Sequence, residues 1–381
     1  MSTEDLTGPR RFVERLRPAV RALRPYEPGK PIEEVQRELG LDHIVKLASN
    51  EYPEGPFPEV AAAIRDELGE LHRYPDATWH QLLDAVTNVY PIARDEVLFG
   101  NGANEILELI VHLVAGEGEQ IVYAHPSFPI YGLLAQSHFD MGVSVPLTGD
   151  HVHDLDAMAD AITPRTRVVM VCNPNNPTGT YVGEDELVRF LERVPSDVLV
   201  VLDEAYVEFT TAPDFPDFFR LRERFANLVS VRSFSKVYSI AALRIGYCIA
   251  HREVIGMLQR VRQPFNVNRL AQRAATVALG RQDLVAERRE TNRRRLDALG
   301  EGLQELGCRT VPSQTNFFLA FTPEASTEVF QALLREGVIV RPMHRFGLGE
   351  GSFRVNTGTD EENAAFLRAL ERVLAAGATG V

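Results

Sequence analysis

The residues around Lys236 read Val231-Arg232-Ser233-Phe234-Ser235-Lys236-Val237-Tyr238-Ser239-Ile240-Ala241-Ala242-Leu243-Arg244-Ile245-Gly246-Tyr247. The hydroxyl groups of Ser233 and Ser235 precede the lysine, and the guanidinium of Arg244 follows it. Such groups can hold a phosphate through neutral and charge-assisted hydrogen bonds. This stretch therefore predicts a cofactor site in which a phosphate lies beside a reactive amine.

Apolar runs alternate with helical patterns from about residue 97 onward. Continuous runs of valine, leucine and isoleucine are typical of strands that are buried on both faces. We therefore expect an α/β fold with a mostly parallel sheet covered by helices. The expected strands are 96–99, 120–123, 167–171 and 198–202, and a helix is expected at 105–113.

Polar loops follow several of these expected strands. They lie at 100–104, 172–179, 203–204 and 233–236. Ligands of open α/β sheets gather outside the carboxyl ends of the strands. We therefore expect the four loops to meet at one crevice.

The pattern changes after about residue 270. A long charged helix at 283–306 is followed by expected strands at 316–321 and 338–341 and by a closing helix at 361–375, which favours a smaller α+β domain. The predicted division is an arm at 1–45, a large domain at 46–275 and a small domain at 276–381. The basic run 288–295 lies in the charged helix, where we expect a solvated face.

Composition narrows the range of partners. The 381 residues have a formal net charge of −13, which argues against binding to a nucleic acid backbone. The three cysteines are scattered, so neither a disulfide framework nor a metal site is predicted. Because no segment has the pattern of a signal peptide or a membrane span, we expect a cytoplasmic protein with no membrane partner.

Two motifs invite other interpretations. Gly100-Asn101-Gly102 begins like a dinucleotide-binding fingerprint, but Glu105 stands where the third glycine is needed. The residues Ser233 to Lys236 satisfy the Ser-x-x-Lys pattern of penicillin-binding enzymes, yet Ser-Asp-Asn and Lys-Thr-Gly occur nowhere downstream. Neither class is favoured.

Asp203 closes the apolar run 198–202 and is expected to be partly desolvated. A desolvated carboxylate needs a cationic or hydrogen-bond-donating partner. A protonated pyridine nitrogen would be such a partner. The preceding loop Asn173-Pro174-Asn175-Asn176-Pro177-Thr178-Gly179 could be a simple turn, although its position after a buried strand favours a place in the site.

Motifs along nearly the whole chain together resemble one family. They are Leu23-Arg24-Pro25-Tyr26-Glu27-Pro28-Gly29-Lys30-Pro31, Asn50-Glu51-Tyr52-Pro53, Arg73-Tyr74-Pro75-Asp76, the loop 173–179, Asp203-Glu204-Ala205-Tyr206, the stretch 233–244 and Arg354. The chain resembles the fold-type I aminotransferases that depend on pyridoxal 5'-phosphate, most closely their histidinol-phosphate aminotransferase branch. The resemblance implies a large domain with a seven-stranded sheet.

The resemblance implies roles around the cofactor ring. Lys236 would form a Schiff base with pyridoxal phosphate, and Asp203 would keep the pyridine nitrogen protonated. Tyr206 and Asn176 would bond the phenolic oxygen, and Phe128 would stack on the ring.

It also implies a phosphate site and a homodimer. The phosphate would be held by the side chains of Ser233, Ser235 and Arg244 and by the backbone N–H groups of Ala103 and Asn104. Tyr74 would reach the phosphate from the neighbouring subunit. The arm at 1–45 would join the small domain and the dimer partner.

For the substrate, the resemblance implies that Arg354 grips the carboxylate, with Arg341, Asn176 and Tyr26 also in the pocket. The implied reaction transfers an amino group between glutamate and 2-oxoglutarate, on one side, and histidinol phosphate and imidazole-acetol phosphate, on the other, in histidine biosynthesis. Asn104 and the residues at 239–242 and 356–357 depart from the branch pattern. An aminotransferase for aromatic or specialised-metabolism amino acids and a threonine-phosphate-type decarboxylase therefore remain alternatives.

Overall fold

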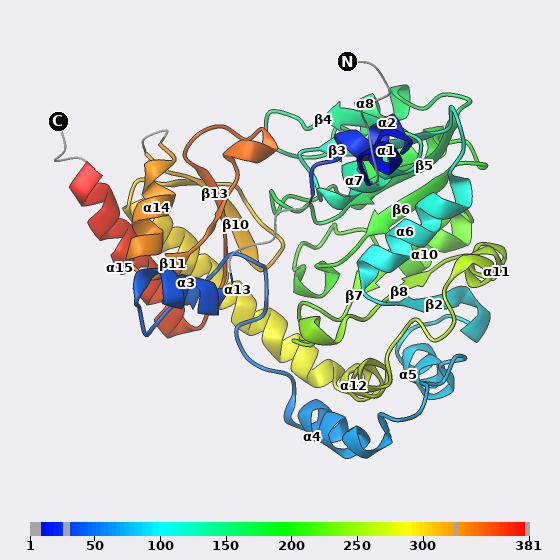
Figure 1. Cartoon of the computed structure of the whole chain (residues 1–381), viewed down its shortest axis with the longest axis horizontal. Coiled ribbons are helices and arrows are strands. Elements are labelled where there is room, and N and C mark those ends of the chain that lie inside the picture. Colours follow the sequence, from blue (N-terminus) through cyan, green and yellow to red (C-terminus); the bar gives the residue numbers. More distant parts are fainter. Residues whose placement is uncertain (1–8, 26–30, 324–325, 378–381) are drawn as a thin grey trace.

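A seven-stranded sheet forms the centre of the larger lobe (Figure 1). The computed structural model describes residues 9–25, 31–323 and 326–377. Within them, the strand order is β2-β8-β7-β6-β5-β3-β4, and β8 alone runs antiparallel to its neighbours. The prediction of a mostly parallel sheet is confirmed. The strands are β2 (Val97–Gly100), β3 (Gln120–His125), β4 (Gly142–Pro146), β5 (Thr166–Cys172), β6 (Leu199–Asp203), β7 (Leu228–Ser233) and β8 (Gly246–Ile249).

Helices cover this sheet because its central strands are apolar on both faces. Every residue of β2, β7 and β8 is buried. Helix α6 packs against β2, β5, β7 and β8, while α12 packs on both α4 and α5 at the lower edge of Figure 1. The helices of this lobe are α4 (Pro58–Glu67), α5 (His80–Val89), α6 (Ala103–Val114), α7 (Ile130–Ser137), α8 (Leu155–Asp160), α9 (Glu184–Arg193), α10 (Phe218–Arg224), α11 (Arg252–Val261) and α12 (Arg269–Leu279).

The smaller lobe has an antiparallel sheet of order β12-β13-β10-β9 and a parallel pair, β1 and β11. The expected strand at 338–341 is therefore two short strands in different sheets, since β11 pairs with β1 and β12 pairs with β13. The elements are β1 (Val45–Lys46), β9 (Arg309–Thr310), β10 (Phe317–Phe321), β11 (Val338–Ile339), β12 (Arg341–Pro342), β13 (Ser352–Asn356), α3 (Ile32–Leu39), α13 (Gln282–Glu305), α14 (Glu328–Arg335) and α15 (Asp360–Gly377).

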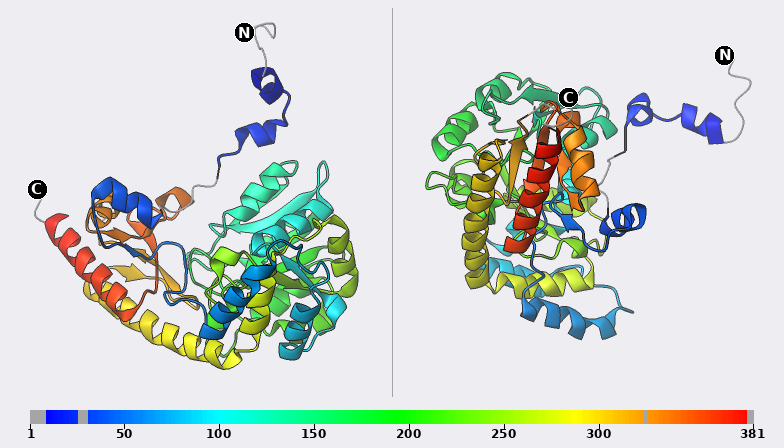
Figure 2. Two further views of the ribbon diagram at one scale, coloured as in Figure 1. Left: turned by 60° about the horizontal axis from the view of Figure 1, so that its bottom comes forward. Right: turned by 90° about the vertical axis from the view of Figure 1, so that its left-hand side faces the viewer.

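Helix α13 contributes to both hydrophobic cores. Val285 belongs to the core of the larger lobe, while Leu296, Leu299 and Leu303 belong to that of the smaller lobe. Figure 2 shows the helix running between the lobes. One continuous helix contributes to both hydrophobic cores, so the predicted boundary between the domains at residue 275 stays a prediction.

The N-terminal helices α1 (Pro9–Glu14) and α2 (Pro18–Ala22) project from the body of the molecule (Figure 2). Helix α2 contacts α7. No helix in the described part of the chain combines the length and apolar character that crossing a membrane requires.

Candidate active site

A cavity of about 270 Å³ lies where the carboxyl ends of β5, β6 and β7 face the smaller lobe. All four polar loops predicted to converge contribute to its wall. The predicted site residues that line it are Ala103, Asn104, Phe128, Asn176, Asp203, Tyr206, Ser233, Ser235, Lys236, Arg244, Arg341 and Arg354. Residues 48–51 complete the wall from the segment that enters the larger lobe.

Lys236 follows β7 and places its amine inside this cavity. Its Nζ donates to the carbonyl oxygen of Ser49 at 3.4 Å and lies 5.5 Å from the ring centroid of Tyr206. Burial, reinforced by the positive charge of Arg354, lowers the pKa of Lys236 to about 8. The amine can therefore be neutral near physiological pH, which a nucleophile or general base requires.

Asp203 ends β6 as a buried carboxylate. Its Oδ2 accepts from the hydroxyl of Tyr131 at 2.7 Å, and its Oδ1 accepts from the backbone N–H of Ala205 at 3.2 Å. Burial raises the pKa of Asp203 despite these hydrogen bonds. A cationic partner in the cavity would offset this desolvation.

Tyr206 and Phe128 frame the cavity with aromatic rings. The hydroxyl of Tyr206 accepts from Nδ2 of Asn50 at 2.9 Å, and its ring meets that of Phe317 edge-on. Phe128 packs edge-on against Tyr131, with ring centroids 5.8 Å apart. Tyr206 is thus held by a neighbour in the cavity wall and by a ring behind it, and Phe128 by a ring that does not line the cavity.

An anion cradle lies at the start of α6. Gly102 precedes this helix without a side-chain cap, so the first N–H groups of α6 face the cavity. Arg244 donates to Oγ of Ser235 at 3.4 Å, and Oγ of Ser233 accepts from the backbone N–H of Ser235 at 3.0 Å. A Cβ at residue 102 would lie 2.5 Å from a guanidinium nitrogen of Arg244, so glycine permits the close approach of the arginine.

Two arginines enter the cavity from the smaller lobe. Arg341 and Arg354 are paired across β12 and β13, so their side chains leave the same face of the sheet. Arg354 donates to Oδ1 of Asn176 at 2.5 Å and to the carbonyl oxygen of Ala48 at 2.7 Å. This arrangement suits a carboxylate or a doubly charged phosphate group.

Of the predicted tyrosines within the described residues, Tyr206 lines the cavity and Tyr74 does not. Tyr74 is 78% exposed and stacks on Phe265, with ring centroids 4.7 Å apart. Tyr26 lies outside the described residues.

Sequence reasoning missed Tyr131 and the role of Asn50. Asn50 was quoted within a motif, but its contact with Tyr206 joins residues 156 positions apart, and no local pattern signals that. Tyr131 lies three residues after Phe128, just inside α7, and its backbone N–H donates to the carbonyl oxygen of Phe128 at 3.1 Å.

The cavity fits pyridoxal 5'-phosphate. The cradle at α6 suits its phosphate, the Lys236 amine suits its aldehyde and the buried Asp203 carboxylate suits its ring nitrogen. The aromatic wall at Phe128 suits its ring.

Comparisons with known proteins agree with this chemistry. Residues 42–370 match the family model for aminotransferase class I and II. A histidinol-phosphate aminotransferase of Moorella thermoacetica is 45% identical over 364 residues, which cover 95% of this chain and 94% of that protein. The crystal structure of histidinol-phosphate aminotransferase from Sinorhizobium meliloti in complex with pyridoxal-5'-phosphate matches with a TM-score of 0.85 at 26% identity, covering 95% of this chain and 98% of that one.

A decarboxylase shares the fold as well. The crystal structure of L-threonine-O-3-phosphate decarboxylase from Porphyromonas gingivalis matches with a TM-score of 0.77 at 26% identity, covering 87% of this chain and 100% of that one. The longer and closer match in sequence is nevertheless to aminotransferases. The chain therefore belongs to the class I and II aminotransferases, in their histidinol-phosphate aminotransferase branch, and is an enzyme that depends on pyridoxal 5'-phosphate.

Proposed function

We propose that the enzyme transfers an amino group between glutamate and 2-oxoglutarate, on one side, and histidinol phosphate and imidazole-acetol phosphate, on the other. The paired arginines carry this proposal, because one donor substrate presents a carboxylate and the other a phosphate. A planar guanidinium can bind either group through two parallel hydrogen bonds. Relatives named as histidinol-phosphate aminotransferases support the choice of substrate.

Pyridoxal phosphate, when bound, supplies a carbonyl that takes up the amino group and an electron-withdrawing ring. The start of α6 with Ser233, Ser235 and Arg244 would hold its phosphate. Asp203 would hold a proton on the ring nitrogen, and Tyr131 would keep this carboxylate in place.

Lys236 is the residue proposed to move the proton. Its amine is enclosed by the cavity wall, and the lowered pKa of about 8 leaves part of it neutral at physiological pH. A neutral amine can remove the proton from the substrate Cα, and the resulting ammonium can return it. Tyr206 and Asn176 would orient the reacting groups from either side of Lys236.

Arg354 would fix the substrate so that its Cα lies near this amine. The bond from Arg354 to Asn176 joins the smaller lobe to the loop after β5, so substrate binding would draw on both lobes. Arg341 would add a second guanidinium for the phosphate of histidinol phosphate.

The proposed working unit is a homodimer. Tyr74 lines no part of the cavity of its own chain and is exposed, as are Leu68 and Leu71, which precede it by six and three residues. This exposed apolar surface supports contact with a second copy, to whose phosphate site Tyr74 would contribute. Helices α1 and α2, which project from the body of the chain, would contact the same partner (Figure 2).

Single half-reactions test the proposal. The enzyme loaded with pyridoxal phosphate is mixed with glutamate, histidinol phosphate or phenylalanine, and the absorbance of the bound cofactor is followed. Histidinol phosphate and glutamate are expected to react fastest. A preference for phenylalanine would contradict the assigned substrate, and release of carbon dioxide from a phosphorylated amino acid would indicate a decarboxylase.

The Lys236→Ala variant tests the assigned proton carrier. Removing a general acid or base lowers rates by about 10²- to 10⁴-fold. We expect this variant to bind the cofactor but to react that much more slowly with glutamate. Full turnover would contradict the role of Lys236.

A further inference from the structure

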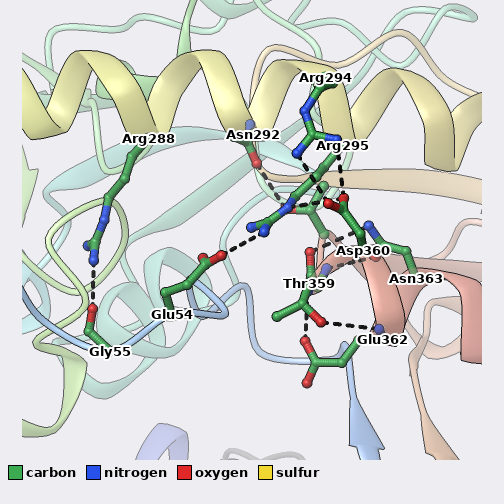
Figure 3. Close-up of polar contacts among 12 residues, drawn as sticks. Glu54, Gly55, Arg288, Asn292, Arg294, Arg295, Thr359, Asp360, Glu362 and Asn363 are labelled. Atoms are coloured by element: carbon green, nitrogen blue, oxygen red, sulfur yellow. Dashed lines mark hydrogen bonds and ion pairs between the residues drawn. The ribbon is translucent and has the colours of Figure 1, made fainter.

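Arg288 on α13 holds the loop that carries Lys236. One of its guanidinium nitrogens donates to the carbonyl oxygen of Val237 at 2.6 Å and to Oγ of Ser239 at 2.7 Å. The other terminal nitrogen donates to the carbonyl oxygen of Gly55 at 2.6 Å (Figure 3). Arg288 therefore joins three backbone segments that are distant in sequence.

Aromatic rings fix the guanidinium between these acceptors. Its central carbon lies 4.6 Å from the ring centroid of Tyr52 and 4.1 Å from that of Phe57. Cation–π contacts of this kind favour a planar guanidinium, which presents its donors in a rigid fork. Lysine carries a single point charge and cannot meet the same three acceptors in this geometry.

Ser239 has a backbone conformation that side chains disfavour. Its φ is +56°, in the left-handed region, and its N–H donates to the carbonyl oxygen of Lys236 at 3.0 Å. The turn that follows Lys236 is thus closed by a non-glycine residue. The bond from Arg288 to its hydroxyl offsets part of this conformational cost.

The same face of α13 reaches the segment that follows Arg354. Asn292 and Arg295 lie four and seven residues after Arg288, at helical spacing (Figure 3). Oδ1 of Asn292 accepts from the hydroxyl of Thr357 at 2.9 Å, three residues beyond Arg354. One helix face therefore contacts both the Lys236 loop and the end of the strand that carries Arg354.

The basic run was expected to form a solvated face, and for this face of the helix that expectation is wrong. Arg294 is exposed, but Arg295 is buried and contacts Glu54 at 2.6 Å and Asp360 at 3.4 Å. Arg288 and Arg295 therefore bind other segments of the protein, whereas Arg294 faces water.

We propose that Arg288 is a positioning residue, which fixes the Lys236 amine through the turn at 237–239 and couples it, along α13, to the segment that follows Arg354. The inference rests on the proposed role of Lys236 as the proton-moving amine. Arg288 lines no part of the cavity, so it would act through the turn and not on the substrate.

The test compares Arg288→Lys with Arg293→Lys in the full-length holoenzyme. Arg293 lies on the same helix and pairs within it with Asp297, so it controls for loss of an arginine. The readouts are the pH titration of cofactor absorbance without substrate, hydrogen exchange of residues 236–240, and the single-turnover rate with glutamate.

For Arg288→Lys we expect a shifted titration midpoint, faster exchange at 236–240 and a rate lowered by about 10- to 100-fold, because a small misplacement of a reacting group costs that much. The apparent affinity for glutamate, which depends on Arg354, should change little. Arg293→Lys should match the wild type in every readout. Equal behaviour of the two variants would overturn the proposal.

Ser239→Ala removes only the hydrogen bond between Arg288 and Oγ of Ser239. It replaces Arg288→Lys as the test if that variant does not fold. Loss of one hydrogen bond predicts a rate lowered by about 2- to 10-fold. The double variant should lose less than the product of the two single losses, because both substitutions break the same bond. Rate losses that multiply independently in the double variant would refute the coupling. A wild-type rate and a wild-type titration of cofactor absorbance in Ser239→Ala would also refute it. A wild-type enzyme that neither binds pyridoxal phosphate nor reacts with glutamate would instead refute the proposed function.

Discussion

The hydrogen bond from Tyr131 to Asp203 provides a quantitative test of the buried carboxylate. The Tyr131→Phe substitution removes the hydroxyl that donates at 2.7 Å but keeps the ring that packs on Phe128. A hydrogen bond to a charged group contributes about 1.5–3 kcal/mol, whereas one between neutral groups contributes about 0.5–1.5 kcal/mol. The loss should therefore depend on whether Asp203 is ionised.

The pH dependence has a definite sign. In the cofactor-free protein, burial raises the pKa of Asp203 above its ordinary value of 3.8. Because the unfolded chain ionises this group at its ordinary pKa, the buried charge costs folding free energy as pH rises above that value. Tyr131 reduces this cost by donating to the carboxylate, so its removal should raise the pKa of Asp203 further.

We expect the free energy of unfolding of Tyr131→Phe to lie about 1 kcal/mol below wild type at acid pH and about 2 kcal/mol below it in alkali. With an unfolding entropy of about 2.1 cal/mol/K per residue over 381 residues, about 2 kcal/mol corresponds to a melting temperature lower by roughly 2–3 °C. Denaturation of the cofactor-free protein at several pH values between 5 and 9 measures the difference.

The Tyr123→Phe variant is the matched control. Its ring lies 6.5 Å from that of Tyr131, and within the described residues its hydroxyl makes no hydrogen bond to a carboxylate. Its effect on stability should not grow as Asp203 ionises. A deficit of Tyr131→Phe that stays constant or shrinks as pH rises would refute the reasoning.

Three further predictions concern the substrate, the ring and the dimer. Arg354→Lys should lower kcat/KM for glutamate by about 10- to 100-fold in steady-state assays, since one charge-assisted hydrogen bond contributes about 1.5–3 kcal/mol, and an unchanged value would remove Arg354 from the pocket. Asn50→Ala removes a donor that orients Tyr206 and offsets part of the rise that burial causes in the pKa of its hydroxyl, so it should lower kcat by about 2- to 10-fold in the same assays; a wild-type kcat would count against that contact. Inactive Tyr74→Ala and Lys236→Ala chains should regain activity when refolded together, because one site of each mixed dimer is intact, and no recovery would contradict a shared site.

The sheet could be predicted from sequence because its strands are continuous apolar runs. The expected strand at 198–202 corresponds to β6, and the expected helix at 283–306 corresponds to α13. The split of 338–341 could not be predicted, since it depends on β1 pairing with β11 from nearly 300 residues away. Short edge pairings of this kind carry no local periodicity.

The site residues could be predicted where a chemically suitable side chain also lies at the end of an expected buried strand. Asp203 ends strand β6 and Lys236 follows strand β7, and ligands of α/β sheets gather outside the carboxyl ends of such strands. Arg288 was misjudged because charge runs on helices usually face solvent, and only the fold shows which members of a run are covered. Its acceptors are backbone carbonyls, which sequence does not distinguish.

The segment 48–50 explains why the proposed site needs both lobes at once. Arg354, from the smaller lobe, donates to the carbonyl oxygen of Ala48, and Lys236, from the larger lobe, donates to that of Ser49. The backbone N–H of Asn50 bonds the side chain of Asn356, while its own side chain bonds Tyr206.

Successive residues of this segment are thus held from opposite lobes. A shift of one lobe relative to the other would change the spacing between the guanidinium that grips the substrate and the amine that takes its proton. Reacting groups must be placed within a fraction of an ångström for efficient catalysis, so the backbone at 48–50 acts as a common reference for both. Helix α13 contacts the turn that follows Lys236 and the segment that follows Arg354. The backbone at 48–50 and α13 together therefore set the distance between Lys236 and Arg354, which neither lobe determines alone.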